Sequence, residues 1–473
     1  MTKLLTAERL TIAIDRSRPV SISEQITSNL RDAIVEGRLE PGARLPSWLD
    51  MATQLGVARG TVKAAYERLA DEDLVIPSGA AGTRVAELRA SLPAAAPTSI
   101  PRPLQGVELG FYLKPLPFQM GVPAQDAFPA KLWSRMRTRA VRDDAMAPVG
   151  MADPRGHPQL RAQIASYLAI ARGIRCLPDQ IFLTNGYKNG LCLTVLTLGV
   201  FGRSAWMEDP GFPMARTGLE LAGMKTVSVP VDAEGIIVER GVALAPDAAI
   251  AVVTPGQQAP TGVALSPRRR RALLDWAVRE DAWIVEDDYL SELQLSGRAA
   301  PAMAGSDPHG RVIHIGTFGK TISPALGLGF VVAPLSLAAR FGEVAGYLAP
   351  APNSTTQLAL ANFIADGHYL RHLRHMKSLY RDRRDALLAH LGDDCGADAS
   401  AGLAVLKRLP KGADDVALAA RALDLGIAPV PLSIWSDDRA NADPGLLLGV
   451  TNLCPRQLAK ACNTLGLAIG KPH

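Results

Sequence analysis

A proline-rich segment divides the chain, and it constrains the fold more than any other feature. Residues 88–106 are LRASLPAAAPTSIPRPLQG, in which prolines recur among Ala, Ser and Thr. Proline at this density disfavours the interiors of both helices and sheets, so we expect a semi-extended linker. The sequence therefore predicts a multidomain protein: a small domain over residues 1–87, a linker over 88–115 and a large domain over 116–473.

Composition and cysteine usage exclude several classes of protein. Hydrophobic residues make up 48% and charged residues 21%, which is ordinary for globular domains and excludes general disorder. The apolar run at residues 191–201 is shorter than the roughly 20 residues of a membrane-spanning helix, and no secretory signal is evident. The 5 cysteines are scattered, with spacing that suits neither disulfides nor zinc. We expect a reduced, cytoplasmic protein with no metal site and no membrane partner.

The N-terminal segment has the pattern of three helices followed by a hairpin. Ser21 and Glu24 have the spacing of a capping box at the start of the first helix. A short second helix begins at residues 46–47 and ends near residue 56. A third begins at residues 58–61, with apolar residues on one face, and the runs 74–76 and 83–86 form a hairpin. This order predicts a small α+β domain with a winged helix-turn-helix.

A winged helix-turn-helix binds DNA through the start of its second helix and through its wing. The net charge of +5 is too small to support DNA binding by itself, so the position of the charges decides the prediction. A small protein-interaction module with three helices remains an alternative. The predicted contacts to double-stranded operator DNA are Arg44, Ser47, Arg59, Thr61, Lys63, Gly82 and Thr83.

The same residues resemble a known family. GARLPSWLDMATQLGVARGTVKAAYERL followed by SGAAGTRVA is similar to the winged helix of GntR-type bacterial transcription regulators. Two positions depart from that pattern. Leu49 stands where the family usually has an arginine that binds phosphate, and Gly60 stands where a polar residue is common. The resemblance implies DNA binding, with weaker non-specific affinity because of Leu49.

Short β-branched runs alternate with helical patterns in the C-terminal segment. Such alternation predicts a mostly parallel sheet covered on both faces, with ligands gathered beyond the carboxyl ends of its strands. The helical pattern of 371–384 is rich in Arg and His and is interpreted as a solvated helix face. The expected strands are 181–184, 205–207, 250–254, 283–285 and 312–315, and a helix is expected over 268–280.

The residues that follow these strands suit a phosphorylated, electron-poor aromatic aldehyde. Helix-start amides bind phosphate, an acid keeps a pyridine nitrogen protonated, and a lysine forms a Schiff base. Gly319-Lys320-Thr321 is not the end of a P-loop, because His314 occupies the position of the required first glycine. The pair Asp287 and Asp288 has no His or second acid cluster at metal-ligand spacing.

The segment from residue 118 onward resembles aminotransferases of fold type I. The stretches ADPRGHPQLRAQIASYL, EDPGFP, VTPGQQAPTG, IVEDDY and GTFGKTISPALGLGF carry the resemblance. Together with the winged helix, the chain is identified as a member of the MocR-type regulators. The resemblance implies an α/β PLP-dependent transferase domain that binds pyridoxal 5'-phosphate (PLP) as an internal aldimine on Lys320 and forms a homodimer. It also assigns Asp287 to the pyridine nitrogen, Tyr289 to the phenolic oxygen, Phe212 to ring stacking, and Gly186, Tyr187 and Lys188 to the phosphate.

Several positions depart from the aminotransferase pattern and remove phosphate ligands. Gly327 replaces an arginine seven residues after the lysine, and Met151 replaces a tyrosine that reaches the neighbouring subunit's phosphate. Gly319 replaces a serine, and Gly256 and Gln257 replace Ser and His. Losing one charge-assisted contact weakens binding by roughly one to two orders of magnitude. Lys188 compensates in part, or else it is an ordinary solvated helix residue.

The final strand lacks the arginine that holds a substrate carboxylate. The matching stretch GLLLGV has leucines there, which argues against ordinary transamination, so no catalytic residue is assigned. We expect a transcription regulator that senses PLP or an amine adduct of PLP. Two alternatives remain open: an aminotransferase with a DNA-binding appendage, and a regulator with a degenerate PLP site that senses another ligand or only dimerises the DNA-binding domains.

Overall fold

The computed structural model describes residues 12, 14–17, 19–78, 82–87, 115–147, 150–295, 300–392 and 402–470. The chain divides into two compact units, residues 1–104 and 105–473. Most of the linker predicted over 88–115 lies outside the described residues. None of the described helices combines the length and the apolar character needed to cross a bilayer.

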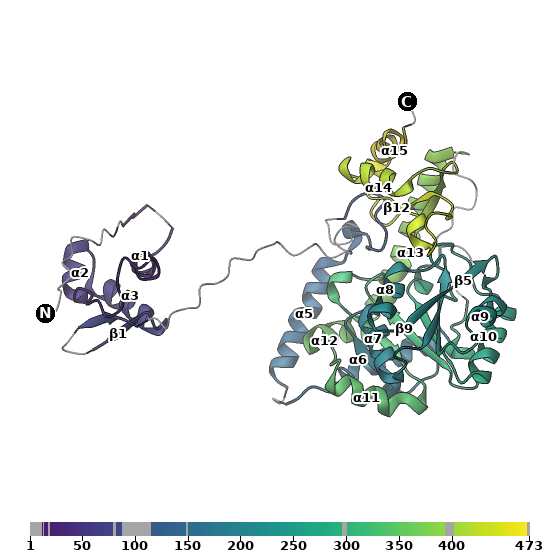
Figure 1. Ribbon diagram of the computed structural model, residues 1–473, viewed down its shortest axis with the longest axis horizontal. Helices are drawn as coiled ribbons and strands as arrows, with labels where there is room; N and C mark the ends of the chain where they lie inside the picture. Colours follow the sequence, from purple (N-terminus) through teal and green to yellow (C-terminus); the bar gives the residue numbers. More distant parts are fainter. Residues whose placement is uncertain are drawn as a thin grey trace. The chain divides into compact units, whose positions relative to one another are not determined.

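The N-terminal unit contains three helices and an antiparallel hairpin, as predicted (Figure 1). Ser21 Oγ accepts a hydrogen bond from the amide of Glu24 and so caps the first helix at 3.2 Å. Gly56 has a φ of 61° and ends the second helix in a left-handed conformation, which glycine adopts without strain. Leu30 and Leu69 are fully buried between the helices. The elements are α1 (Ile22–Val35), α2 (Trp48–Leu55), α3 (Arg59–Asp71), β1 (Val75–Pro77) and β2 (Thr83–Val85).

The C-terminal unit is built on an eight-stranded sheet with the order β3-β10-β9-β8-β7-β4-β5-β6. The five strands β9, β8, β7, β4 and β5 are parallel to one another, whereas β10 is antiparallel to both β3 and β9. Strand β3 therefore runs in the same direction as the parallel strands. The strands are β3 (Ile181–Thr184), β4 (Ser204–Asp209), β5 (Lys225–Asp232), β6 (Gly235–Ile236), β7 (Ile250–Val253), β8 (Trp283–Asp288), β9 (Val312–Thr317) and β10 (Gly329–Val332).

Helices cover both faces of this sheet (Figure 1). Strand β4 shows the alternation: Trp206 packs with α10 on one face, where its ring stacks on Trp276 at 3.9 Å, and Met207 packs on the other face. This alternation follows from the period of two in a strand. On the Trp206 face lie α9 (Val238–Leu244) and α10 (Pro267–Arg279); on the Met207 face lie α7 (Tyr187–Leu198), α8 (Pro213–Leu221) and α11 (Ala338–Tyr347).

A second layer of helices joins the sheet to a smaller C-terminal subdomain. The subdomain has an antiparallel sheet with the order β11-β13-β12. The further helices are α5 (Ala130–Ala145), α6 (Pro158–Ala171), α12 (Ser354–Ala365), α13 (His368–Leu391), α14 (Asp415–Asp424) and α15 (Pro455–Ile469), and the strands are β11 (Ala404–Arg408), β12 (Val430–Pro431) and β13 (Gly445–Gly449).

The structure contains every predicted strand and adds others that the sequence pattern did not reveal. The helix predicted over 268–280 is α10. The pattern of 371–384 lies within α13, and only part of it is a solvated face, because His372 and Arg383 are buried where α13 packs against the core. Strand β5 was missed because Pro230 interrupts its alternating pattern, and it pairs with the two-residue edge strand β6. Strand β10 was missed because it has only four residues and follows a glycine-rich stretch, a pattern that is also typical of a loop.

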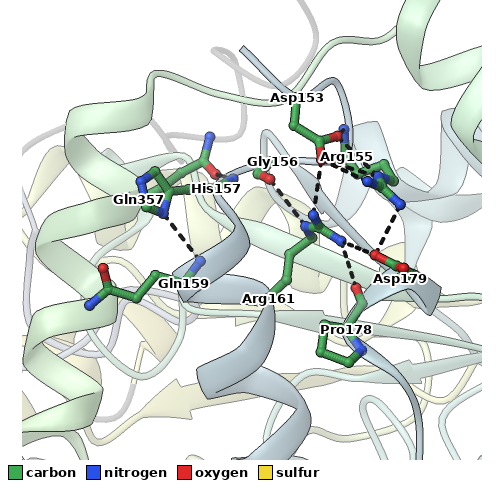
Figure 2. Close-up of polar contacts among 9 residues, drawn as sticks. All are labelled: Asp153, Arg155, Gly156, His157, Gln159, Arg161, Pro178, Asp179 and Gln357. Carbon is green, nitrogen blue, oxygen red and sulfur yellow. Dashed lines mark hydrogen bonds and ion pairs between the residues drawn. The ribbon is translucent and has the colours of Figure 1, made fainter. Parts of the chain in front are cut away.

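A buried arginine holds together the loop that precedes α6 (Figure 2). The side chain of Arg161 is only 4% exposed, and it donates to the carbonyl oxygens of Gly156 at 3.1 Å and Pro178 at 3.0 Å. It also lies 2.9 Å from carboxylate oxygens of Asp153 and Asp179. One guanidinium group thus satisfies two carboxylates and two backbone carbonyls, which fixes the conformation of this loop.

We expect Arg161→Ala to lower the free energy of unfolding of the C-terminal unit by about 1–3 kcal/mol, because it removes a buried side chain and leaves the carbonyl of buried Gly156 without this donor, whereas Asp153 and Asp179 keep Arg155 as a partner. The measurement is urea unfolding followed by tryptophan fluorescence. The control is Arg340→Ala, which removes an exposed pair with Glu343 and costs at most about 1 kcal/mol. Equal losses in the two variants would contradict the structural role of Arg161.

Candidate functional site

The predicted DNA-binding residues lie at the start of α3 and around the hairpin. Arg59 and Lys63 are exposed on α3, whereas Thr61 is half-buried, and Lys63 makes only a surface pair with Glu67 at 3.6 Å. The first backbone amides of α3 have no side-chain cap, since Ala58 occupies the cap position. The start of α3 therefore combines free amides with exposed cations, which suits contact with a phosphate backbone.

Arg44 and the hairpin form one surface. Arg44 is exposed, and its Nε atom lies 2.8 Å from where a Cβ would be at Gly82, which has a φ of 86°. The amide of Leu45 donates to the carbonyl oxygen of Thr83 at 2.9 Å. The structure therefore brings Arg44, Gly82 and Thr83 together, as the predicted wing requires.

Ser47, a predicted DNA contact, is exposed at the start of α2 and caps this helix. Its hydroxyl accepts from the amide of Asp50 at 3.1 Å and donates to the Asp50 carboxylate at 2.6 Å, so it caps α2. The next two side chains, Trp48 and Leu49, are exposed by 44% and 41%. Sequence reasoning missed Trp48, although a tryptophan in the first turn of a polar helix is itself a signal for contact with a partner.

The predicted cofactor residues converge at one edge of the large sheet. Asp287 is the penultimate residue of β8, Lys320 lies in the turn after β9, and Tyr187 begins the helix that follows β3. Phe212 precedes α8, just after β4. Because these four strands run in the same direction, their carboxyl ends meet at the same edge, where open α/β sheets bind ligands.

The amine of Lys320 is buried against a backbone carbonyl. Its Nζ donates to the carbonyl oxygen of Gly121 at 3.0 Å. Burial lowers the pKa of Lys320; the carboxylate of Asp287 opposes this effect, and the charge of Lys188 adds to it. A lowered pKa increases the fraction of neutral amine, which is the nucleophilic form of a lysine.

Asp287 is a buried acid with a free oxygen. Its Oδ1 atom has no hydrogen-bond partner among the residues that the structure describes, and its side chain is nearly inaccessible. Burial raises the pKa of Asp287 well above its usual value, and the charges of Asp288 and Glu208 raise it further. The buried hydroxyl of Tyr187 interacts with the same carboxyl group. Burial and then the charge of Asp287 raise the pKa of Tyr187, and the interaction with Tyr187 opposes the rise in the pKa of Asp287.

Glu208 is a second buried acid beside Asp287, and sequence reasoning did not single it out. Its Oε2 atom accepts from Thr254 Oγ1 at 2.5 Å and from the amide of the same residue at 3.3 Å. Burial raises the pKa of Glu208 to about 7. The sequence signal that could have identified Glu208 was an acid within an apolar strand, because a buried charge without a partner is rare.

Aromatic rings line the same edge. The ring of Phe212 lies 6.0 Å from Tyr187 and 6.0 Å from Trp435, which sequence reasoning also missed. Tyr289 packs near Phe212, and burial, followed by the charge of Asp287, raises the pKa of its hydroxyl. Phe212 thus lies in a row of rings that offers a flat aromatic ligand a packing surface.

The turn expected to bind phosphate supplies mainly backbone groups, and its side chains contribute little charge. Gly186 caps α7 with a φ of 79°, and Lys188 is exposed in the first turn. Gly327 has a φ of 57° and open space around it, so this position supplies no charge. The amide of Gly319 donates to Thr317 Oγ1 at 3.1 Å and closes the turn before Lys320.

Residues 115–124 form a strap that crosses the small subdomain and reaches Lys320. The carbonyl oxygen of Phe118 accepts from the amide of Gly449, the last residue of β13, at 2.8 Å. The carbonyl oxygen of Val122 accepts from Thr451 Oγ1 at 2.6 Å. Gly121 has a φ of 80°, which glycine adopts without strain, and a Cβ at this position would lie 2.7 Å from Lys320 Nζ. No motif in the sequence indicated this contact.

Strand β13 brings a hydrocarbon side chain to the site. Leu447 packs in one cluster with Trp435, Phe212 and Tyr289, whereas the neighbouring Leu446 and Leu448 point into the main core. Leu447 is therefore the residue that occupies the expected position of the carboxylate-binding arginine. At this position the structure has a leucine and no cation, as the sequence motif indicated.

The two units match two protein families. Residues 22–85 match the bacterial regulatory proteins of the gntR family, and residues 137–431 match the class I and II aminotransferases. The fold is similar to that of a Pyrococcus horikoshii kynurenine aminotransferase, with a TM-score of 0.68 and 23% identity over 78% of this chain and 95% of that one. Fold and site together define a helix-turn-helix regulator with an aminotransferase-like second unit.

Whole-length relatives have the same organisation. The chain is 34% identical to the probable rhizopine catabolism regulatory protein MocR of Rhizobium meliloti, over 96% of this chain and 95% of the relative. It is 33% identical to the pyridoxine biosynthesis transcriptional regulator PdxR of Corynebacterium glutamicum, over 81% and 82%. The chain belongs to the MocR-type subfamily of GntR transcription regulators.

The raised pKa of Glu208 predicts a pH-dependent stability. Its pKa of about 7 in the folded chain exceeds the ordinary value of 4.5, so the stability contributed by its neutral form is lost as pH rises through about 7. In the cofactor-free chain, we expect wild type to lose about 1–2 kcal/mol more than Glu208→Gln between about pH 6 and pH 8.5. Thermal unfolding measures the difference, with the exposed Glu220→Gln as the matched control. Parallel pH profiles for wild type and Glu208→Gln would show that Glu208 is already ionised.

Proposed function

We propose that this regulator binds PLP covalently through Lys320 and responds to PLP or to an amine that reacts with it. Bound PLP supplies an electron-poor aldehyde that exchanges primary amines. The regulator acts in the cytoplasm on operator DNA, with residues 1–87 as the DNA-binding domain, 88–115 as the linker and 116–473 as the effector domain.

The observation that carries this proposal is the unpartnered Oδ1 atom of Asp287. A buried acid with a raised pKa and a free oxygen is costly unless a ligand pairs with it. The pyridine nitrogen of PLP is such a partner, since it shares a proton with a carboxyl group. Lys320 and Phe212 lie at the same edge, so the residues present fit the cofactor, with Tyr289 for the phenolic oxygen and the amides of Gly186 and Tyr187 for phosphate.

The strap supports coupling between PLP and the DNA-binding domain. Gly121 accepts a hydrogen bond from the amine that would bind PLP, and residue 115, where the strap begins, is the last residue of the predicted linker. A change in the bonding of Lys320 therefore alters a contact of the segment that leads to the linker. A ligand shifts a conformational equilibrium only through such differential contacts.

We also propose that the chain works as a homodimer. Met151 and Tyr347 are almost fully exposed, and a Cβ built at Gly346 would lie 3.7 Å from the ring of Pro154, so their segments are neighbours. Exposed apolar side chains that gather on one surface favour association. A second copy of this chain is the partner that a two-fold symmetric DNA site requires.

The second candidate is a regulator whose PLP site has degenerated. Gly327 favours this candidate, because a glycine has no side chain that could supply a cation for the phosphate. The remaining cation near the site is Lys188, which is exposed and thus contributes a screened interaction. A working aminotransferase is disfavoured, since Leu447 cannot hold a substrate carboxylate.

The absorption spectrum of the purified full-length chain tests PLP binding. We expect wild type with PLP to show the visible band of a lysine-bound cofactor, Lys320→Ala to lack it, and the exposed-lysine control Lys131→Ala to keep it. Asp287→Asn removes a charge-assisted contact, so its affinity for PLP falls by roughly one to two orders of magnitude. A wild-type chain without the band would support the degenerate site.

DNA binding has its own test. We expect Arg59→Ala to weaken binding to a selected DNA site and to reduce the slope of log affinity against log salt by about 1, because one phosphate contact is lost. Fluorescence anisotropy at several salt concentrations gives both quantities. Arg68→Ala is the matched control, since this arginine lies at the other end of α3 and pairs with Glu24. Identical salt slopes for wild type and Arg59→Ala would remove Arg59 from the interface.

A further inference from the structure

We infer that the effector is a primary amine with an aromatic or aliphatic body and no carboxylate beside the amine. This inference rests on the proposed binding of PLP to Lys320, and it names the class of amine that the same site accepts. Two features of the site support this inference: an apolar wall next to the cofactor residues, and a leucine, Leu447, at the position in that wall where a carboxylate-binding arginine was expected.

The apolar wall consists of Ile434, Trp435 and Leu447, with Met120, Phe212 and Tyr289 packed against it. It is continuous with the cofactor site, because Phe212 and Tyr289 belong to both. Met120 adjoins Gly121, whose carbonyl oxygen contacts the amine of Lys320. A molecule that reacts where Lys320 reacts therefore has hydrocarbon beside it, which favours an apolar body.

The arginines of the surrounding elements are already engaged. Arg216, four residues after Phe212, lies 3.4 Å from Asp437 and donates to Ser228 Oγ at 2.6 Å. Arg172 lies 2.7 Å from Asp288, the neighbour of Asp287. Arg383 pairs with Asp126 at 2.5 Å beside the strap. Each guanidinium thus has a carboxylate that balances its charge, although Nη2 of Arg172 and Nη2 of Arg216 have no hydrogen-bond partner among the described residues. A ligand carboxylate that reached either arginine would have to compete with the carboxylate already paired to it.

The acids near Lys320 offer no partner to an anion. Asp287 and Glu208 at the base of the site supply no positive charge in either protonation state, and Leu447 occupies the place of a cation. An α-carboxylate is held within two bonds of the reacting nitrogen, so an amino acid cannot move its charge away into solvent. A buried charge without a partner is strongly unfavourable, whereas the same molecule without its carboxylate loses nothing.

A matched pair of ligands tests the inference on the full-length, PLP-loaded wild type. The ligands 2-phenylethylamine and L-phenylalanine differ only in the carboxylate, and the change in PLP absorption gives the apparent affinity of each, after correction for their reaction with free PLP. We expect 2-phenylethylamine to bind at least about 100-fold more tightly, as an unpaired buried charge implies. Equal binding, or tighter binding of L-phenylalanine, would overturn the inference.

A variant tests the wall separately. Trp435→Leu removes an aromatic surface whose indole nitrogen has no hydrogen-bond partner in the described parts of the chain. We expect it to weaken 2-phenylethylamine by about tenfold and to leave methylamine unchanged, since methylamine is too small to reach the wall. Equal effects on the two amines would contradict the role of the wall.

The possible outcomes distinguish a failure of this inference from a failure of the proposed PLP binding. If PLP gives its band on wild type and neither phenyl compound alters it, the inference is wrong and PLP binding stands. If PLP gives no band on wild type, the proposed function fails, and the inference fails with it.

Discussion

The buried carboxyl group of Asp287 is the constraint on which the C-terminal unit depends most. Its Oδ1 atom is without a partner in the described structure, and Glu208 and Asp288 make its ionisation still less favourable. Such a group is stable only as a neutral acid or beside a proton-sharing ligand. The parallel strands bring Lys320 and Phe212 to the same edge, so the unfavourable acid, the amine and the aromatic ring lie where open α/β sheets bind ligands.

The departures from an aminotransferase are consistent with regulation in place of turnover. An enzyme must hold both the cofactor phosphate and the substrate carboxylate firmly, and here Gly327 and Leu447 supply neither cation. A sensor needs a ligand that binds reversibly at physiological concentration. The strap adds the second requirement of a sensor, since Gly121 connects the reacting amine to the segment that follows the linker.

Much of this organisation could be predicted from the sequence, because it depends on local patterns. Proline density separated the domains, the caps at Ser21 and Gly56 delimited helices, and motifs after strands identified Asp287 and Lys320. The missed features depend on contacts between distant residues. Trp435 reaches Phe212 only when the small subdomain packs against the sheet, and Gly121 meets Lys320 across 199 residues of sequence. The hydroxyl of Ser47 caps α2, a local contact that the spacing of the residues did not reveal.

The central claim is that the state of the Lys320 site changes DNA binding. The most direct measurement is the dissociation constant of the full-length chain for a DNA site that it selects from a random pool. It is determined at one salt concentration without PLP, with PLP, and with PLP plus 2-phenylethylamine. The account predicts that at least one state differs from the others by about fivefold or more, the usual scale of coupling between two sites. Three identical dissociation constants, with PLP demonstrably bound, would contradict it.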